Sequence, residues 1–407
     1  MAQNAPHHMS FNKSNALTLR LVDSLEQFQT LQSDWDTLYD QSSRSNIFVS
    51  WDWLFTWWEI FKDQYKRELY ILTVYQEDTL VGIAPFQICS APLPRSLIQG
   101  KTLQFIGNGE AWVDSIVSVF QDFIVLPEFE SEVTALVSDY LIEHSKKWQF
   151  ADFEYLLKDA LILQCFKGSG VDESSNKVTR NKVEYGGRFT IPSLDSFELY
   201  KEQMGKRWSK MFRKKSNRLE REGEVTTVVT DSLESIKPAL TQLAEMNCSR
   251  WKGKTGHCVF DSERFFSFHE KIMERLLPKQ KAAIKTLHLD GAAMASYYVL
   301  SDKGQVHYYQ SGFHAEYGNR YSPLFLLIVN GIGEAIKNNI LFDFMFADDK
   351  NSYKKEQYSC DHEPMYRLHW SPQKFRLPLF HSVKAAKDKI TNIKEVINNK
   401  LNKSQKK

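Results

Sequence analysis

In two separate stretches of the chain, apolar residues recur first with the spacing of a helix and then with the spacing of a strand. In the first stretch, a helical pattern runs through Leu31, Trp35 and Leu38, and a second helix carries Trp53, Trp57 and Phe61. Apolar runs over 69–74 and 80–88 then flank the polar turn Glu77-Asp78, which predicts a β-hairpin. The second stretch repeats helix, helix and hairpin over 236–243, 265–273 and 282–300, with the turn at Asp290-Gly291.

Corresponding residues of the two stretches are separated by a constant number of positions in the sequence. Phe260 lies 212 residues after Phe48, and the same spacing separates Met273 from Phe61 and Asp290 from Asp78. Chance similarity of two helix-helix-hairpin segments is the alternative, but a fixed offset favours two copies of one α/β (α+β) module. We expect mixed, mostly antiparallel sheets flanked by helices, with modules at 17–187 and 188–372 and a basic tail at 373–407.

Composition excludes several classes of protein. The 407 residues are 42% hydrophobic, so they can bury large cores, and 52 Lys and Arg against 50 Asp and Glu give no overall attraction to nucleic acid or membrane. The five cysteines are scattered without metal-ligand spacing, which predicts reduced thiols and no metal. No apolar run approaches the length of a membrane span. We therefore expect a cytoplasmic protein without a nucleic-acid partner.

Charge is concentrated in two segments. Over 206–221, Trp208, Lys215 and Leu219 share one side of a predicted helix, and cations surround the other side. This basic helix is either a solvated face or the wall of an anion-binding cleft, and its place between the modules predicts that it faces the cleft between them.

The tail repeats Val383, Ile390 and Ile397 every seven residues among many lysines. Such a helix can pack on the domain, pair with another helix, or lie at an anionic membrane surface such as the inner face of the inner membrane.

An anion site is predicted where an aromatic strand, 308–313, leads to Ser322-Pro323. Proline is tolerated in the first helical turn, and serine is a common N-cap. Free amides at a helix start attract phosphate groups, so a pyrophosphate site is one interpretation and a simple helix start is the other.

The chain resembles GNAT-superfamily acyltransferases of the CelD/BcsL cellulose-biosynthesis type, which are bacterial and similar to the FemABX peptidoglycan aminoacyltransferases. The resemblance covers about 17–370. It rests on Trp51 and Trp57 after Phe48-Val49-Ser50, Arg213 and Arg218 before Gly223, Arg250-Trp251, Tyr309 and Gly312, Ser322-Pro323, and Asp343-Phe344 followed by Tyr353-Lys354.

The resemblance implies tandem GNAT folds that transfer an acyl group from acetyl-CoA or another acyl-CoA, without a metal, to a small-molecule or carrier-linked amine or hydroxyl acceptor. It assigns three sets of residues: catalytic Asp343, Tyr309, Tyr353 and Lys354; donor-binding Ser311, Gly312, Ser322, Pro323 and Leu324; and acceptor-binding Arg213, Lys214, Arg218, Arg250 and Trp251. Leu324, Ala347 and Gln357 depart from the family pattern, so the alternative is a catalytically silent module that binds an anionic glycan, lipid or nucleotide-linked precursor.

Acyl transfer from a thioester needs proximity, a base and an oxyanion site, but no covalent nucleophile. Asp343, between two phenylalanines, is expected to be desolvated with a raised pKa, and to act as base or to orient Lys354. A structural aspartate at the end of a strand is the alternative. Tyr309 and Tyr353 are candidate proton donors to the thiolate or packed aromatics. His307 and Cys248 are interpreted as core residues.

Overall fold

The computed structural model describes residues 16–90, 101–166, 179–347 and 357–371. Within them, one continuous sheet has the strand order β1-β2-β3-β4-β6-β13-β7-β12-β11-β10-β9-β8, and β5 pairs with β3. The first half contains β1 (Leu17–Val22), α1 (Leu25–Thr30), α2 (Gln32–Gln41), α3 (Trp51–Phe61), β2 (Glu68–Gln76), β3 (Thr79–Cys89), β4 (Thr102–Phe105), β5 (Ile124–Val125), α4 (Glu130–Glu143) and β6 (Phe150–Leu156). The second half contains β7 (Thr179–Thr190), α5 (Phe197–Glu222), β8 (Val225–Val229), α6 (Leu233–Thr255), α7 (Glu263–Leu276), β9 (Ala282–Leu289), β10 (Ala292–Asp302), β11 (Gln305–Phe313), α8 (Ala315–Tyr321), α9 (Pro323–Lys337), β12 (Leu341–Ala347) and β13 (Asp361–Ser371).

The strand order confirms the duplication. Five strands of the first module, β1-β2-β3-β4-β6, are mirrored by β8-β9-β10-β11-β12 at the other end of the sheet. In each module the first four strands pair antiparallel, and the fourth and fifth pair parallel (β4 with β6, β11 with β12). The fold therefore consists of two similar α/β units whose sheets merge into one.

Small features repeat as well. Ser50 accepts a hydrogen bond from the Trp53 amide at the start of α3, and Ser262 accepts one from the Phe265 amide at the start of α7. The third strand of each module also carries a β-bulge, since Val81 and Met294 are each an extra residue opposite their partner strand. Bulges and caps depend on few residues, so their repetition at a nearly constant offset supports a common origin for both halves.

The centre of the sheet consists of β13 and β7, which lie between the two sets of five strands. β13 pairs with β6 on one side and with β7 on the other, so a strand from the end of the described chain completes the sheet of the first module. The expected boundary between residues 187 and 188 lies inside β7. The division of the chain at that point stays a prediction.

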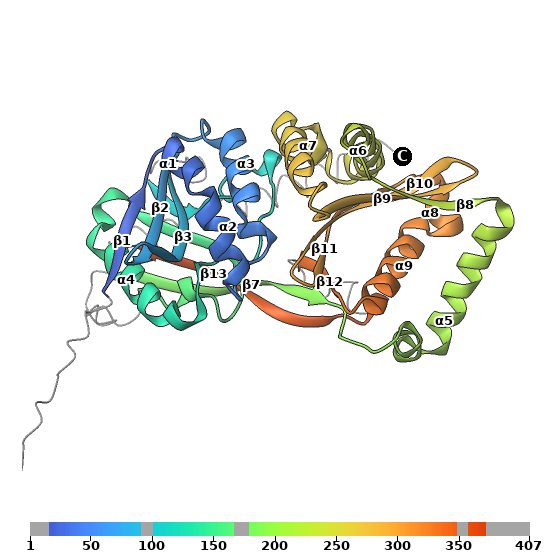
Figure 1. Cartoon of the computed structure of the whole chain (residues 1–407). Helices are drawn as coiled ribbons and strands as arrows, with labels where there is room; N and C mark the ends of the chain where they lie inside the picture. Colours follow the sequence, from blue (N-terminus) through green and yellow to red (C-terminus); the bar gives the residue numbers. More distant parts are fainter. Residues whose placement is uncertain (1–15, 91–100, 167–178, 348–356, 372–407) are drawn as a thin grey trace, which may run out of the picture.

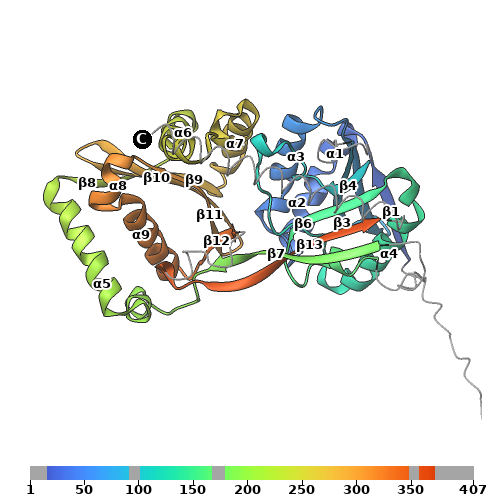
Figure 2. The ribbon, with the colours of Figure 1, turned by 180° about the vertical axis from the view of Figure 1, so that it is seen from behind.

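Helices cover both faces of the sheet (Figures 1 and 2). In the second module, α6 and α7 lie on one face and α9 lies on the other, with α5 outside α9 at the end farthest from the first module. α5 contacts α8 and α9 of its own module, so the expectation that the basic helix faces the cleft between modules is wrong. The chain crosses the boundary in β7 instead, which leaves α5 free to pack at the far side.

Aromatic side chains join the modules. Trp53 on α3 contacts Phe268 on α7 and Tyr309 on β11, with ring centroids 4.9 and 5.8 Å apart. Its indole N–H donates to Ser118 Oγ at 2.9 Å. One apolar cluster contains buried residues of both modules, so the halves share a core.

Cysteine usage differs from the sequence-based expectation. Cys248 and Cys258 form a disulfide that links α6 to the turn before α7, so the expectation that all five cysteines are reduced is wrong. The pairing needs two cysteines that lie only 10 residues apart, a spacing that does not by itself distinguish a disulfide from two thiols. None of the helices that the structure describes is both long and apolar enough to cross a membrane.

The shared core predicts cooperative unfolding. Replacing Trp53 with alanine should lower the unfolding free energy by about 3–5 kcal/mol, because a large buried ring is lost from the interface. Urea titrations followed by tryptophan fluorescence and far-UV circular dichroism should give coincident curves before and after the change. Two separate transitions, of which only one moves, would show that the modules fold independently.

The disulfide predicts a simple thiol count. Denatured protein prepared without reductant should react with three equivalents of Ellman's reagent, because Cys89, Cys165 and Cys360 are outside the disulfide. Reduction should raise the count to the five cysteines of the chain. Five thiols before reduction would contradict the pairing.

Candidate active site

The parallel strands β11 and β12 of the second module pair over a short length and then diverge. β11 pairs with β12 only from Gln305 to His307, and then follows β10 to Phe313. Tyr309 is an extra residue on β11 and forms a bulge next to the point of separation. We call the space between the diverging strands the fork. Main-chain groups of β11 beyond His307 face the fork instead of a neighbouring strand, so they can bind an extended ligand.

The start of α9 lies at the open end of the fork. Pro323 is the first helical residue, as expected. Ser322 has left-handed backbone angles (φ 53°, ψ 53°), and no side chain caps the helix. The Ser322 hydroxyl instead donates to the Gly318 carbonyl at 3.4 Å and accepts a hydrogen bond from Lys215 Nζ at 2.7 Å. Ser322 therefore occupies the expected N-cap position but its side chain does not cap the helix, and the first amides of α9 remain available to a ligand.

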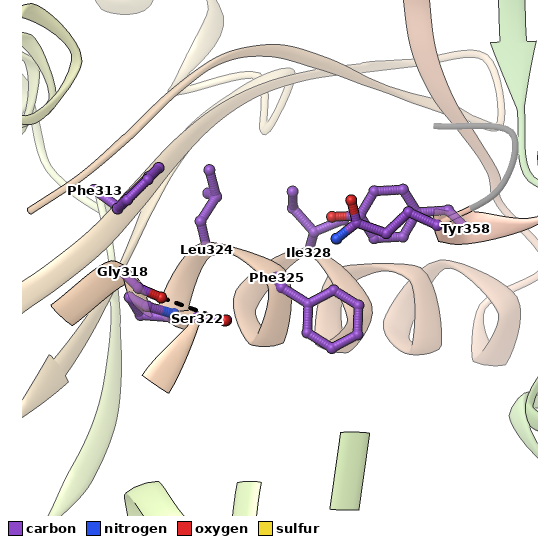
Figure 3. Close-up of a pocket in the computed structure, with 9 residues that line it drawn as sticks. Phe313, Gly318, Ser322, Leu324, Phe325, Ile328 and Tyr358 are labelled. Carbon is purple, nitrogen blue, oxygen red and sulfur yellow. Dashed lines mark hydrogen bonds between the residues drawn. The ribbon is translucent and has the colours of Figure 1, made fainter. Parts of the chain in front are cut away.

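A cavity of about 330 Å³ opens at this helix start (Figure 3). Phe313 from β11, Leu324 and Ile328 from α9, and Tyr358 surround it in the figure. Ser322, Pro323 and Leu324 of the expected donor-binding set line the cavity, and so does Gln357, one of the residues that depart from the family pattern. The cavity thus combines an apolar wall with a helix N-terminus.

Ser311 and Gly312, the other expected donor-binding residues, lie against α6. The Asn247 side-chain amide donates to the Ser311 carbonyl at 2.7 Å. A Cβ on Gly312 would stand 2.6 Å from the backbone nitrogen of Asn247, so glycine allows α6 to cross β11 at close range. The geometry explains Gly312 by helix packing.

The basic helix reaches the site at its inner side. Lys215 lies on the stripe of α5 that sequence periodicity assigned to packing, and its ammonium group meets the start of α9. The guanidinium of Arg218 lies 5.5 Å from the centre of the Tyr321 ring, next to Ser322. Lys214 is exposed, and Arg213 lines a groove of about 920 Å³ along α5. A lysine within an otherwise apolar stripe was the available sequence signal for Lys215.

Asp343 is fully buried on β12 at the base of the fork. Its carboxylate accepts hydrogen bonds from Arg188 Nε (2.9 Å), His307 Nδ1 (3.2 Å) and the Met345 amide (2.7 Å). Burial opposes ionisation, but His307, Arg188 and the Met345 amide together hold the pKa of Asp343 below its usual value. The expected rise of this pKa is wrong, because desolvation is outweighed by three donors. Sequence reasoning missed His307 as a partner, since β11 and β12 meet only in the fold.

Tyr309 is partly buried between the modules. Its hydroxyl donates to the Ile116 carbonyl of the first module, and burial raises its pKa well above the usual value. Its ring contacts His269 and Tyr298, with ring centroids 5.0 and 5.5 Å apart. The bulge residue of the second module is therefore held in place by the first module.

Glu110 lies beside this contact and was missed by sequence analysis. It belongs to the segment between β4 and β5, and its Oε1 accepts the Ile116 amide at 2.7 Å. Its Oε2 is buried, and the Trp57 side chain lies close enough to the carboxyl to favour its charged form by a hydrogen bond. Burial raises the pKa of Glu110 to about 7, against opposing effects of the Ile116 amide and the Arg67 charge. No local pattern signals a buried carboxyl in a loop.

The remaining expected site residues give less information. Tyr353 and Lys354 lie outside the described residues. Trp251 is exposed on α6, and Arg250 precedes it on the same helix. Among the described residues, no group of three or more His, Cys, Asp or Glu side chains is placed to hold a metal.

Comparison with known proteins agrees with this geometry. Residues 206–355 match the family model described as "Acetyltransferase (GNAT) domain", so this part of the second module is similar to acetyltransferases of that class. The fork, the uncapped helix α9 and Lys215 all lie within this matched region. No curated protein sequence matches the chain.

Solved structures extend the similarity to both modules. FemX superposes with a TM-score of 0.56 at 13% identity, over 86% of this chain and 98% of its own, which shows a common fold. The chain is also similar to the C-terminal domain of a putative lysylphosphatidylglycerol synthetase from Agrobacterium fabrum (TM-score 0.49, 12% identity, 88% of this chain and 96% of that one). A tandem GNAT protein from the clavulanic acid biosynthesis pathway matches with a TM-score of 0.41 and 9% identity, over 87% and 98% of the two chains.

Glu110 predicts an unusual pH dependence of stability. Its pKa in the folded protein, about 7, is above the value of 4.5 expected in the unfolded chain. The folded state therefore binds more protons between these values, and stability should fall as pH rises from 4.5 to 7. In Glu110→Gln this part of the fall, about 3 kcal/mol at most, should be absent.

Urea unfolding of both proteins at pH 5 and pH 8 measures this difference. Asp122 provides an internal comparison, because burial also raises its pKa, to about 6, and its own contribution should remain in Glu110→Gln. Equal pH dependence in the two proteins would show that Glu110 titrates normally.

Proposed function

We propose that this protein is an acyltransferase that moves an acyl group from an acyl-CoA-like thioester to an amine or hydroxyl of a small or envelope-polysaccharide precursor. The proposal rests mainly on one observation: the uncapped start of α9, with Lys215 beside it, opens into a cavity at the end of the fork within the matched acetyltransferase region. Resemblance to the CelD/BcsL type motivates the choice of acceptor.

The donor fits this cavity chemically. The phosphate groups of a CoA-type molecule carry negative charge, which the amides and dipole of α9 and the Lys215 ammonium stabilise. Ser322, Pro323 and Leu324 form the corner where these groups bind, and Arg218 adds positive charge next to Tyr321. From there the extended arm of the donor follows the free edge of β11 into the fork.

The thioester then lies near the bulge at Tyr309. A bulge turns main-chain groups away from the regular ladder, so an amide of β11 can donate to the developing oxyanion. Asp343 already accepts three hydrogen bonds and is ionised, so we assign it to hold Arg188 and His307 in place. Tyr353 and Lys354 keep their proposed catalytic roles.

The positive residues of α5 lie at the donor end of the fork. We therefore assign Arg213, Lys214 and Arg218 to the anionic part of the donor or of a carrier. The acceptor approaches the bulge between the modules, on the opposite face of β11 from α9. Arg250 and Trp251, at the outer end of α6, belong to this second route.

Lys215 provides the test of donor binding. Lys215→Ala should weaken the binding of acetyl-CoA by about 10- to 100-fold, because a charge-assisted interaction is worth about 1.5–3 kcal/mol. Isothermal titration calorimetry measures the change. Lys210→Ala is the matched control, since it removes the same charge from an exposed position of the same helix and should bind normally.

A second variant separates charge from packing. Ser322→Asp places a carboxylate at the start of α9, where it should repel the donor while keeping the helix intact. Equal affinity in the wild type, Lys215→Ala and Ser322→Asp would contradict the proposed donor site. Donor binding without turnover across a broad panel of acceptors would favour the silent binding module instead.

A further inference from the structure

Positive charge is concentrated on one helix of the second module. The segment 206–221 of α5 contains eight Lys or Arg and one Glu, a net charge of +7 in a chain whose total is +2. The rest of the chain is therefore net negative. The total charge gives the protein no attraction to an anionic surface, but this uneven distribution turns α5 toward one.

The cations of α5 form a row that faces away from the protein. Trp208 and Leu219 are buried on the inner side of the helix, and α5 lies at the outer edge of the molecule (Figures 1 and 2). On the opposite side, exposed residues recur every three or four positions, which places them in line along a helix. They are Lys206, Lys210, Lys214, Asn217 and Arg221. The row extends over about 22 Å, since a helix rises about 1.5 Å per residue.

These cations are available to an outside partner. Within the part of the chain that the structure describes, no ion pair includes Lys206, Lys210 or Lys214. Glu222, at the end of α5, pairs with Arg320 of α8 instead. Like charges four residues apart on a helix repel each other, so an anionic surface along the row stabilises it.

α5 bends at Gly205, and the bend forms a groove. Gly205 has a positive φ of 82°, which favours glycine, and no atom lies within 4 Å of the place that a Cβ would take. The groove has a volume of about 920 Å³ and is lined by residues from both sides of the bend. They include Lys201 before the bend and Lys206, Lys210 and Phe212 after it. Cations beside an aromatic ring suit a ligand that is anionic in one part and apolar in another.

A lipid surface fits this face better than a nucleic acid. Proteins bind single-stranded nucleic acids with exposed aromatic side chains on which the bases stack. Trp208 and Phe212 instead pack against each other and against Phe325 of α9, with ring centroids 5.6 to 6.4 Å apart. Met211, at the side of the row, is exposed, and an apolar side chain among cations is typical of helices that lie on a membrane surface.

We propose that the outer face of α5 docks the protein on an anionic membrane surface, where the groove at Gly205 binds the headgroup of an anionic phospholipid. The lysines of the row contact lipid phosphates, and Met211 contacts the upper part of the acyl chains. This docking does not depend on the acyl-transfer reaction. The inner side of the same helix carries Lys215 at the start of α9, so the membrane surface lies about one helix diameter, roughly 10 Å, from the proposed donor cavity.

Flotation of the full chain with lipid vesicles tests the proposal. The wild type should bind vesicles that contain phosphatidylglycerol much more tightly than vesicles of phosphatidylcholine alone, and high salt should release it. The double variant Lys206→Glu with Lys210→Glu should bind the anionic vesicles at least about 30-fold more weakly, because each cation near an anionic surface contributes a factor of about five.

The matched control reverses two exposed lysines outside α5, Lys146→Glu with Lys271→Glu. It changes the total charge by the same amount and should keep most of the vesicle binding. Both double variants should have the melting temperature and the acetyl-CoA affinity of the wild type, because none of these four lysines belongs to the proposed donor site.

The remaining outcomes separate the alternatives. Equal loss of vesicle binding in the two double variants would show that only total charge matters, and would overturn the assignment to α5. Binding that persists in Lys206→Glu with Lys210→Glu would overturn it too, because the contact would lie elsewhere in the chain. Wild type that binds polyuridylate RNA but not the anionic vesicles would identify nucleic acid as the partner, and wild type that binds neither would show a solvated face. Vesicle binding without acetyl-CoA binding would contradict the proposed donor site alone.

Discussion

The contact between Tyr309 and Ile116 is the interaction on which the arrangement of the site depends. Tyr309 is the bulge residue of β11, and its hydroxyl reaches the main chain of the first module. Trp53 packs against the same ring from α3. Because the bulge and the first module are fixed to each other, the segment that carries Glu110 has a defined position relative to the fork. The same loop on an isolated module would lack this defined position.

Duplication produced two forks, and the copies differ in what surrounds them. In the first module, β4 and β6 pair only at Thr102 and Leu103, and beyond them the rings of Phe105 and Phe153 lie 5.0 Å apart across the gap. These residues belong to the core beneath α4. In the second module the corresponding place on β11 carries the bulge and faces the other module. One copy therefore supplies a packed scaffold and the other supplies the site.

Sequence periodicity predicted the features that depend on neighbouring residues. The hairpins around Glu77-Asp78 and Asp290-Gly291 and the first helical residue Pro323 all follow from local patterns. The fixed offset revealed the duplication because it is found by comparing one half of the chain with the other.

Features that need distant segments were missed or misassigned. The placement of β13 between β6 and β7, and of α5 beyond α9, depends on contacts between segments far apart in the sequence. Glu110 has no local signal, since the burial of one side chain is set by residues far away in sequence. For Lys215 the local signal was its place in an otherwise apolar stripe, which does not identify the group that its ammonium meets. For Ser322 the local rule failed, because its backbone adopts left-handed angles and its hydroxyl meets Lys215 instead of a helix amide.

Two features of the site are locally unfavourable, and they lie at opposite ends of the fork. At one end, Ser322 holds a left-handed conformation that costs a non-glycine residue about 1 kcal/mol, and it leaves α9 without a side-chain cap. At the other end, burial disfavours the charged form of the Glu110 carboxyl and raises its pKa to about 7. Neither feature improves packing. A side chain that caps α9 would stabilise the free protein more at position 322, and an apolar side chain would do so at position 110. The first feature becomes favourable when an anion meets the helix start, so stability that the free protein gives up there is recovered by binding at the donor end of the fork.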